Sequence, residues 1–332
     1  MDIPFSTLVG GAGWGEHARA WVRERAAEAG LRLTGPIEQP RIRPWSTQLV
    51  APTDRGLLWF KANCDALAFE PALHAVLAEL EPDEVDEPLA VDADRGWILS
   101  RDRGTTLGEQ REATLADWRR LLATAAGMQR RLSGHGARLL ATGLPDCSPG
   151  TVPGRFDEMV ERLRELPVDH PSHLSAGRAA ELVAGRGAVE EAAAALTAAP
   201  LPVSVQHGDL HPRNVFEVGG ALRLFDFGDA QWAHPLEVLA VPYGWLTQLT
   251  QIRFADVVPA WCEAWGDVVS PSEMESLLPA AMVTHAVNRS WTWWGATEQA
   301  TREELREWGD GPLHFLALAL EPFPPTAVEQ DS

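Results

Sequence analysis

The residues best suited to chemistry lie between positions 206 and 230, in the segment QHGDLHPRNVFEVGGALRLFDFGDA. A predicted strand leads into Asp209, Asn214 follows five residues later, and a second apolar strand ends at Asp226. Phosphoryl transfer needs one carboxylate that orients an attacking hydroxyl group, and a second carboxylate and a neutral oxygen that hold Mg²⁺ against the phosphates. These residue types in this order are typical of such a site. The alternative is that both aspartates occupy ordinary turns at strand ends.

Lys61 is the only lysine among the 28 basic residues of the chain, and all the others are arginine. Arginine offers a planar fork of donors, whereas lysine offers a compact charge on a flexible stem. A site that grips phosphate oxygens in a narrow cleft can require lysine. Lys61 is therefore a candidate phosphate ligand, and survival of one lysine by chance is the alternative.

The elements that must position these residues begin with a strand-rich region. Lys61 lies near the end of a predicted strand that follows the turn PTDRG, and apolar side chains then recur at helical spacing. The predicted elements of this region are a helix at 14–29, strands at 41–51 and 56–62, a helix at 65–80 and two strands within 89–100.

Helical patterns dominate after about Gly104. The predicted helices cover 115–132, 155–166, 176–199 and much of the chain from 236 onward, and short strands are predicted at 203–206 and within 215–225. This order predicts an α+β fold with two lobes: a small antiparallel-sheet N-lobe (1–103) and a larger, mainly helical C-lobe (104–332). The hinge is expected near 100–104, and the cleft between the lobes is the natural ligand site.

Composition limits the partners of this 332-residue chain. Its net charge of -19 argues against nucleic acid or an anionic membrane as the main partner, and it is compatible with a cationic substrate. No apolar run reaches the roughly 18 residues of a membrane span, and the N-terminus lacks the pattern of a secretory signal. The three cysteines show no metal or disulfide spacing, so we expect a cytoplasmic protein.

The segments HGDLHPRN and DFGD, together with Lys61 in FKA, resemble the aminoglycoside phosphotransferase and choline kinase-like family of the protein-kinase-like superfamily. The resemblance covers nearly the whole chain in order: lysine, helix, hinge, catalytic loop, metal loop and terminal helices. It implies a bilobal protein-kinase-like fold. It also implies a small-molecule kinase that uses ATP and Mg²⁺.

Matching by position, the resemblance implies that Asp209 is the catalytic base, that Asn214 and Asp226 bind Mg²⁺, and that Lys61 contacts the nucleotide phosphates. A helix glutamate should hold the lysine. Glu70 is preferred over Glu79, because nine residues at about 100° each place the two on opposite helix faces. His207 is expected to brace the catalytic loop.

The resemblance is weaker at the loop that covers the phosphates. The candidate is Pro44-Trp45-Ser46-Thr47, which contains no glycine, although the hydroxyls of Ser46 and Thr47 could meet phosphate oxygens. A strand with a surface turn is the alternative. The glycine-rich segment 10–15 has neither a preceding strand nor a GK[ST] end, so we expect a flexible approach to the first helix.

The acceptor pocket is implied to involve the terminal helices, with Trp291, Trp294 and Asp229 as candidate substrate contacts. Aromatic faces can hold sugars or cations, and core packing of the tryptophans is the alternative. Glu237 is expected to contact the catalytic loop.

The predicted function is transfer of the γ-phosphate of ATP to a hydroxyl group of a small molecule, such as an aminoglycoside or an amino sugar. The alternative is a nucleotide-binding regulatory module with a kinase fold and no turnover, which the missing glycine-rich loop favours.

Overall fold

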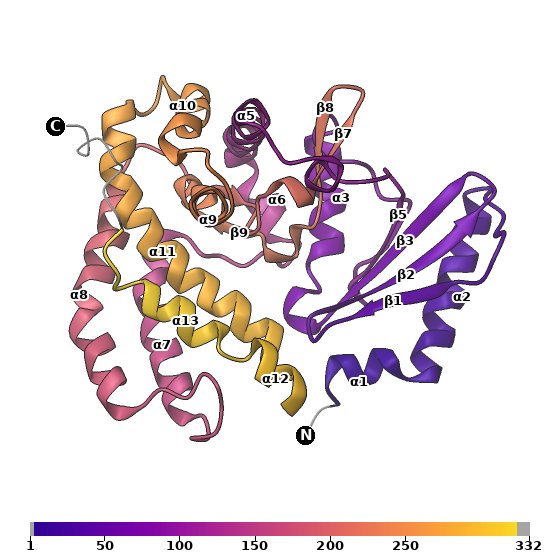
Figure 1. Cartoon of the computed structure of the whole chain (residues 1–332), viewed down its shortest axis with the longest axis horizontal. Helices are drawn as coiled ribbons and strands as arrows, with labels where there is room; N and C mark the ends of the chain where they lie inside the picture. The colour runs from indigo at the N-terminus through magenta and orange to yellow at the C-terminus, as the bar shows by residue number, and fades with distance from the viewer. Residues whose placement is uncertain (1–2, 324–332) are drawn as a thin grey trace.

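The computed structural model describes residues 3–323; positions 1–2 and 324–332, the ends of the two expected lobes, lie outside the described residues. Figure 1 shows a sheet with one long helix beside it on one side of the molecule and a larger group of helices on the other. The α+β architecture predicted from the sequence is confirmed. None of the helices within 3–323 is both long enough and apolar enough to span a membrane.

The N-terminal region is built on a five-stranded sheet with the order β1-β2-β3-β5-β4, in which every neighbouring pair is antiparallel. Lys61 lies in the central strand, opposite Gln48 on one side and Ile98 on the other. The strands are β1 (Glu38–Ile42), β2 (Ser46–Thr53), β3 (Gly56–Asn63), β4 (Ala90–Asp92) and β5 (Trp97–Arg101).

Two predictions for this region are wrong. The single strand expected at 41–51 is two strands separated by a turn at 43–45, because Pro44 cannot donate to a strand ladder. The glycine-rich segment expected to be flexible is helical: its residues end α1 (Phe5–Gly10) and begin α2 (Ala12–Glu28).

Helix α2 covers one face of the sheet. Ala18 and Val22 are fully buried there, and Trp21 lies edge-on to Phe60 and Trp97 with ring centroids 5.7 Å from each. Burying this many aromatic and aliphatic groups stabilises the small sheet by several kcal/mol, at about 25 cal/mol per Å² of apolar surface. The sheet is therefore a rigid support for Lys61.

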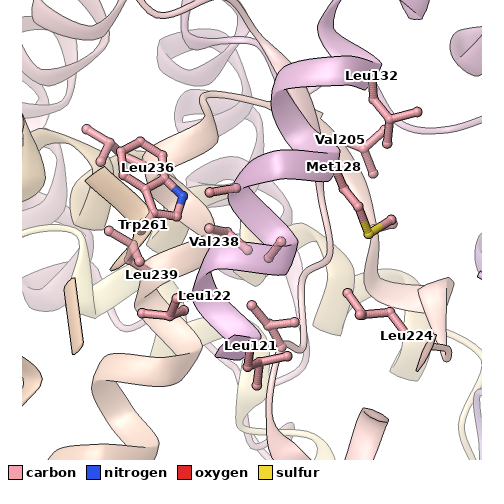
Figure 2. Close-up of a cluster of buried hydrophobic side chains, with 14 of the residues drawn as sticks. Leu121, Leu122, Met128, Leu132, Val205, Leu224, Leu236, Val238, Leu239 and Trp261 are labelled. Atoms are coloured by element: carbon pink, nitrogen blue, oxygen red, sulfur yellow. The ribbon is translucent and has the colours of Figure 1, made fainter. Parts of the chain in front are cut away.

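The larger region packs around α5 (Leu115–Leu132), whose predicted bounds are confirmed. Figure 2 shows its buried side chains, including Leu121, Leu122 and Met128, against apolar groups of the segments that surround it. Its neighbours include α3 (Glu70–Leu80), α6 (Gly136–Leu140), α9 (Ala240–Leu249) and α10 (Phe254–Trp265).

A second helical layer joins α7 (Val152–Glu165) and α8 (Ala176–Ala198) to the C-terminal helices. The longest helix, α11 (Pro271–Thr297), connects the two layers because it contributes buried residues to both hydrophobic clusters. The remaining helices are α4 (Leu107–Gln110), α12 (Arg302–Trp308) and α13 (Gly311–Leu318).

Four short strands carry the loops that bear the candidate chemistry. β6 (Ser204–Gln206) pairs with β9 (Gln231–Ala233), and β7 (Val215–Val218) pairs with β8 (Ala221–Leu224), both antiparallel. Asp209 follows β6 and Asp226 follows β8. The two aspartates thus leave two separate strand pairs, rather than neighbouring strands of one sheet.

Candidate active site

The loop after β6 and the loop after β8 pack at the limit of van der Waals contact. Gly208 has φ of 81°, and a Cβ atom placed there would lie 1.9 Å from the carbonyl oxygen of Asp229. Only glycine allows both the left-handed conformation and this approach. His207 is buried, and its Nε2 donates to the carbonyl of Phe225 at 3.0 Å. His207 thus braces one loop against the other, as expected.

Asp209 is held as an ionised carboxylate. Its Oδ2 accepts hydrogen bonds from His211 Nε2 at 3.2 Å and from Asn214 Nδ2 at 3.1 Å, and Arg289 lies 4.0 Å from its Oδ1. Burial would raise the pKa of Asp209, but the hydrogen bond from His211 and the charge of Arg289 outweigh burial and hold this pKa below its usual range. The carboxylate is therefore ready to accept a hydrogen bond from a hydroxyl group.

Lys61 lies between two carboxylates. Its Nζ is 2.6 Å from Glu70 Oε2 and 2.6 Å from Asp226 Oδ1, whereas Glu79 is paired with Arg138. Burial would lower the pKa of Lys61, but the charges of Asp226 and Glu70 outweigh burial and raise it. Lys61 is therefore a fixed positive charge beside the loop that follows β8.

Asp226 is the only non-glycine residue with positive φ (64°) in the described chain. Such a conformation is costly for a residue with a side chain and persists where the surroundings impose it, often at functional sites. Burial would raise the pKa of Asp226, but Lys61 outweighs it and lowers this pKa. The carboxylate is ionised, and Lys61 engages only its Oδ1.

Asp209, Asn214, Asp226 and Lys61 line one cavity of about 400 Å³. The part of the chain that the structure describes holds no cluster of three or more His, Cys, Asp or Glu side chains arranged for a metal. A Mg²⁺ ion that also binds phosphates needs only one or two protein carboxylates. The oxygen donors of Asn214 and Asp226 therefore fit Mg²⁺ that is bound together with a nucleotide.

The side chains of Ser46 and Thr47 point to opposite faces of the sheet, because successive residues of a strand alternate between its two faces. Ser46 lines the cavity. Thr47 is fully buried away from it: its Oγ1 donates to the carbonyl of Arg41 at 2.8 Å and accepts from Gln39. The expectation that the Thr47 hydroxyl reaches phosphate oxygens is not met in this structure.

Three cavity residues were missed by the sequence analysis. Arg41 donates to Ser46 Oγ at 3.0 Å, but its buried Nε has no partner. Arg289 forms a 2.8 Å ion pair with Asp229, and the indole of Trp293 also lines the cavity. Arg41 carries no motif, so the sequence offered no signal for it. Arg289 and Trp293 lie on α11 beside the candidates Trp291 and Trp294, and that proximity was the available signal.

The turn between β1 and β2 reaches the C-terminal helices. The Trp45 ring lies edge-on to Trp293 and Trp308, with centroids 5.8 and 5.2 Å away, and Arg43 lies over the Trp308 ring at 5.5 Å. The turn that was expected to cover the phosphates is thus held against the opposite lobe.

Trp291, Trp294 and Asp229 line a second cavity of about 290 Å³, which adjoins the first and shares Leu67, Gly228, Asp229 and Thr292 with it. Only Asp229 among these three substrate candidates also lines the cavity with Asp209. The Glu237 side chain accepts hydrogen bonds from Thr284 and Asn288 of α11, and none, within residues 3–323, from the loop at 207–214 that it was expected to contact.

A family model described as "Phosphotransferase enzyme family" matches residues 60–277. No curated protein matches. The similar solved structures include a Plasmodium vivax ethanolamine kinase (10% identity, TM-score 0.66, 94% of this chain and 89% of that chain). A type I macrolide 2'-phosphotransferase is also similar (16% identity, TM-score 0.57, 88% and 95%).

A spectinomycin phosphotransferase in complex with ADP and spectinomycin matches as well, with 11% identity, a TM-score of 0.53, and coverage of 91% and 97%. Identities this low show the fold alone. They confirm the kinase-like fold that the sequence predicted.

Proposed function

The chain belongs to the phosphotransferase enzyme family, and we propose that it transfers the γ-phosphoryl group of ATP to a hydroxyl group of a small molecule. The observation that carries the proposal is the convergence of Lys61, Asp209, Asn214 and Asp226 on one cavity. These residues come from positions as distant as 61 and 226, and from both lobes. Ordinary turns at strand ends would have no reason to meet a partly buried lysine.

Asp209 orients the acceptor hydroxyl and receives its proton. The hydroxyl oxygen bonds to the γ-phosphorus as the bond to the β–γ bridging oxygen breaks, and ADP leaves with that electron pair. Asp209 can take this role because its carboxylate is ionised and lines the cavity. Positioning and neutralisation of charge supply most of the rate enhancement in such reactions.

Asn214 and Asp226 are the residues that would hold Mg²⁺, as their oxygen donors suit a hard cation. When bound, Mg²⁺ neutralises charge on the phosphate oxygens. Lys61, fixed by Glu70, supplies a second positive charge to the α- and β-phosphates. The spectinomycin phosphotransferase structure that contains ADP supports nucleotide use at this fold.

Arg41 and Ser46 take the place of a glycine-rich phosphate loop. No carboxylate oxygen lies within 4.0 Å of Arg41 in the described chain. Burial lowers the pKa of its guanidinium group, because burial disfavours the charged form. A partly buried cation without a counter-ion is costly unless a ligand supplies the opposite charge. A triphosphate does so, and arginine binds phosphate through two parallel donors.

The acceptor is a small hydroxylated molecule, with aminoglycosides and amino sugars among the candidates, and the net charge of -19 gives a weak preference for cations. We place the protein in the cytoplasm, because Cys64, Cys147 and Cys262 are buried free thiols.

The second candidate is a nucleotide-binding regulatory module without turnover. The glycine-free turn held by Trp45 favours it, whereas the ionised Asp209 in the cavity favours catalysis. Release of ADP from Mg·ATP, measured with aminoglycosides, amino sugars, neutral sugars and amino alcohols, separates the two. Acceptor-dependent ADP release supports the kinase; ATP binding without acceptor-dependent release across the panel supports the module.

A further inference from the structure

The second cavity lies where an acceptor must lie if the proposed phosphotransfer is correct, and the inference below rests on that function. The cavity shares Asp229 and Thr292 with the catalytic cavity, so a molecule inside it can present a hydroxyl group toward Asp209. Its walls include side chains of α7 and α11, the segment 228–231 and the segment 66–69. These walls decide which acceptors fit.

The aromatic faces of this cavity are already occupied by cations of the chain itself. The guanidinium of Arg155 lies 5.1 Å from the centroid of Trp291. Arg162 lies 5.1 Å from Trp291 and 5.6 Å from Trp294. A cationic acceptor would need these faces for cation–π contacts, and would have to displace a guanidinium to reach them. The cavity is therefore a poor site for an amine.

Among the charged residues that line this cavity, Arg155 is the one without an ionic partner in the part of the chain that the structure describes. Asp229 is paired with Arg289 at 2.8 Å. Arg162 is paired with Glu158 at 2.9 Å and lies 3.9 Å from Glu298. Arg155, in contrast, has no carboxylate oxygen within 4.0 Å among residues 3–323.

The partners of Arg155 are neutral. Its Nε donates to Asn288 Oδ1 at 3.2 Å. Glu237 contacts the same asparagine, but burial raises the pKa of Glu237 to about 8, so its carboxyl group is mostly protonated at neutral pH. Glu237 therefore leaves most of the charge of Arg155 uncompensated, and a bound anion would compensate it.

A hydrogen-bond acceptor completes the site. Gln231 lines the cavity and is only 4% exposed. Its Nε2 donates to Thr292 Oγ1 at 2.9 Å and to the carbonyl of Asn288, whereas its buried Oε1 has no partner. A buried carbonyl oxygen without a donor is destabilising. A ligand hydroxyl group would satisfy it.

We infer that the acceptor is a hydroxylated carboxylic acid. Its carboxylate is bound by Arg155, one hydroxyl group donates to Gln231 Oε1, and the reacting hydroxyl group reaches Asp209. The charged residues that line the cavity balance one another, so the preference rests on the unpaired guanidinium of Arg155, which suits a carboxylate with one negative charge better than a phosphate with two. Arg155 thus favours an anionic acceptor, whereas the net charge of the chain favours a cationic one.

The test compares acceptors that differ in one group. One set is glycerol, glycerate and 3-amino-1,2-propanediol, and the other is glucose, glucuronate and 6-amino-6-deoxyglucose. We expect ADP release from Mg·ATP to be at least about tenfold higher in kcat/KM for the carboxylate of a set, since a charge-assisted hydrogen bond contributes about 1.5–3 kcal/mol. A preference for the amine or the neutral member overturns the inference and leaves the proposed function intact. No release with any member, from a chain that binds ATP, counts against both.

Substitutions in α7 test whether Arg155 binds the carboxylate of the acceptor. Arg155→Gln should raise KM for the preferred carboxylate at least tenfold without raising KM for ATP, and Arg155→Lys should recover part of the loss. Arg164→Gln is the matched control, because Arg164 lies on the same helix and pairs only with Glu161. An unchanged KM for the carboxylate in a folded Arg155→Gln variant overturns the assignment.

Discussion

At the scale of residues, the cavity that contains Asp209 is organised by paired charges. Lys61 is neutralised by Glu70 and Asp226, and Arg289 by Asp229, so these groups hold one another in place. Arg41 differs because its guanidinium has no carboxylate partner and an unpartnered Nε. Within the described residues, Arg41 is therefore the cation of this cavity that has no carboxylate within 4.0 Å, and we expect it to bind an incoming anion.

We expect Arg41→Gln to weaken the binding of ATP about tenfold or more and to leave the affinity for adenosine unchanged, because the lost contacts are with phosphate. Calorimetric titration of both ligands measures this. Arg55→Gln, an exposed change at the β2–β3 turn, is the control. Equal loss of ATP and adenosine affinity, or no loss, contradicts the assignment of Arg41.

The sequence pointed to Lys61, Asp209, Asn214 and Asp226 of this cavity, but not to Arg41 or Arg289. HGDLHPRN and DFGD are recognisable because their chemistry fixes both residue type and spacing. Arg41 could not be found, since one arginine among many carries no pattern. The Thr47 hydroxyl was expected to meet phosphate oxygens, but Thr47 faces away from the cavity. The face of the sheet to which a strand residue points depends on where the strand begins, which the sequence pattern did not give.

At the scale of elements, two loops and α11 surround Asp209, the proposed catalytic base. Gly208 allows the catalytic loop to touch the backbone of Asp229, and Glu237 connects the segment after β9 to α11. These contacts join segments far apart in sequence, so short motifs could predict the loops but not what they pack against. The expected partner of Glu237 was wrong for this reason.

Gly208→Ala should abolish most activity and lower the free energy of unfolding by about 2 kcal/mol or more, because the new Cβ meets the Asp229 carbonyl and the residue keeps positive φ. Urea denaturation and ADP release measure the two effects. Gly219→Ala is the matched control: Gly219 also has positive φ, but a Cβ atom added there would have no neighbour within 4 Å. Similar losses in both variants would contradict a role for the close contact.

Glu237 makes stability depend on pH. Its pKa is about 8 in the folded chain against 4.5 ordinarily, so the folded state binds the extra proton and loses stability as pH rises from about 5 to 8. Glu237→Gln imitates the protonated carboxyl group and should raise Tm relative to wild type by at least about 3 °C at pH 8 and less at pH 5. Thermal melts between pH 5 and pH 8 measure this difference in Tm. If the Tm difference between Glu237→Gln and wild type is the same at pH 5 and pH 8, as expected for the exposed control Glu263→Gln, this prediction is wrong.

At the scale of the whole molecule, Trp45 connects the two lobes. The lobes themselves were predictable, because a change from strand patterns to helix patterns is a long-range signal in the sequence. The aromatic contact of Trp45 with Trp293 and Trp308 was not, since it depends on how the lobes are placed relative to each other.

Trp45→Ala should speed the release of bound ADP about fivefold or more, because two aromatic pairs at about 0.5–1.5 kcal/mol each hold the turn over the cavity. Stopped-flow measurement with a fluorescent ADP analogue gives the rate. Trp45→Phe keeps an aromatic ring and should lie near wild type. If both variants release ADP at the wild-type rate, the turn does not control access to the cavity.

The most direct measurement of the central claim compares kcat for ADP release in wild type and Asp209→Asn, using the best acceptor of the panel. The amide keeps the shape of the side chain but cannot take the hydroxyl proton, and the hydrogen bond from Asn214 can be retained. We predict a fall in kcat of at least about a hundredfold, the usual contribution of a general base, with Tm and ATP affinity preserved. An Asp209→Asn variant that folds, binds ATP and keeps substantial kcat would show that Asp209 is not the catalytic base.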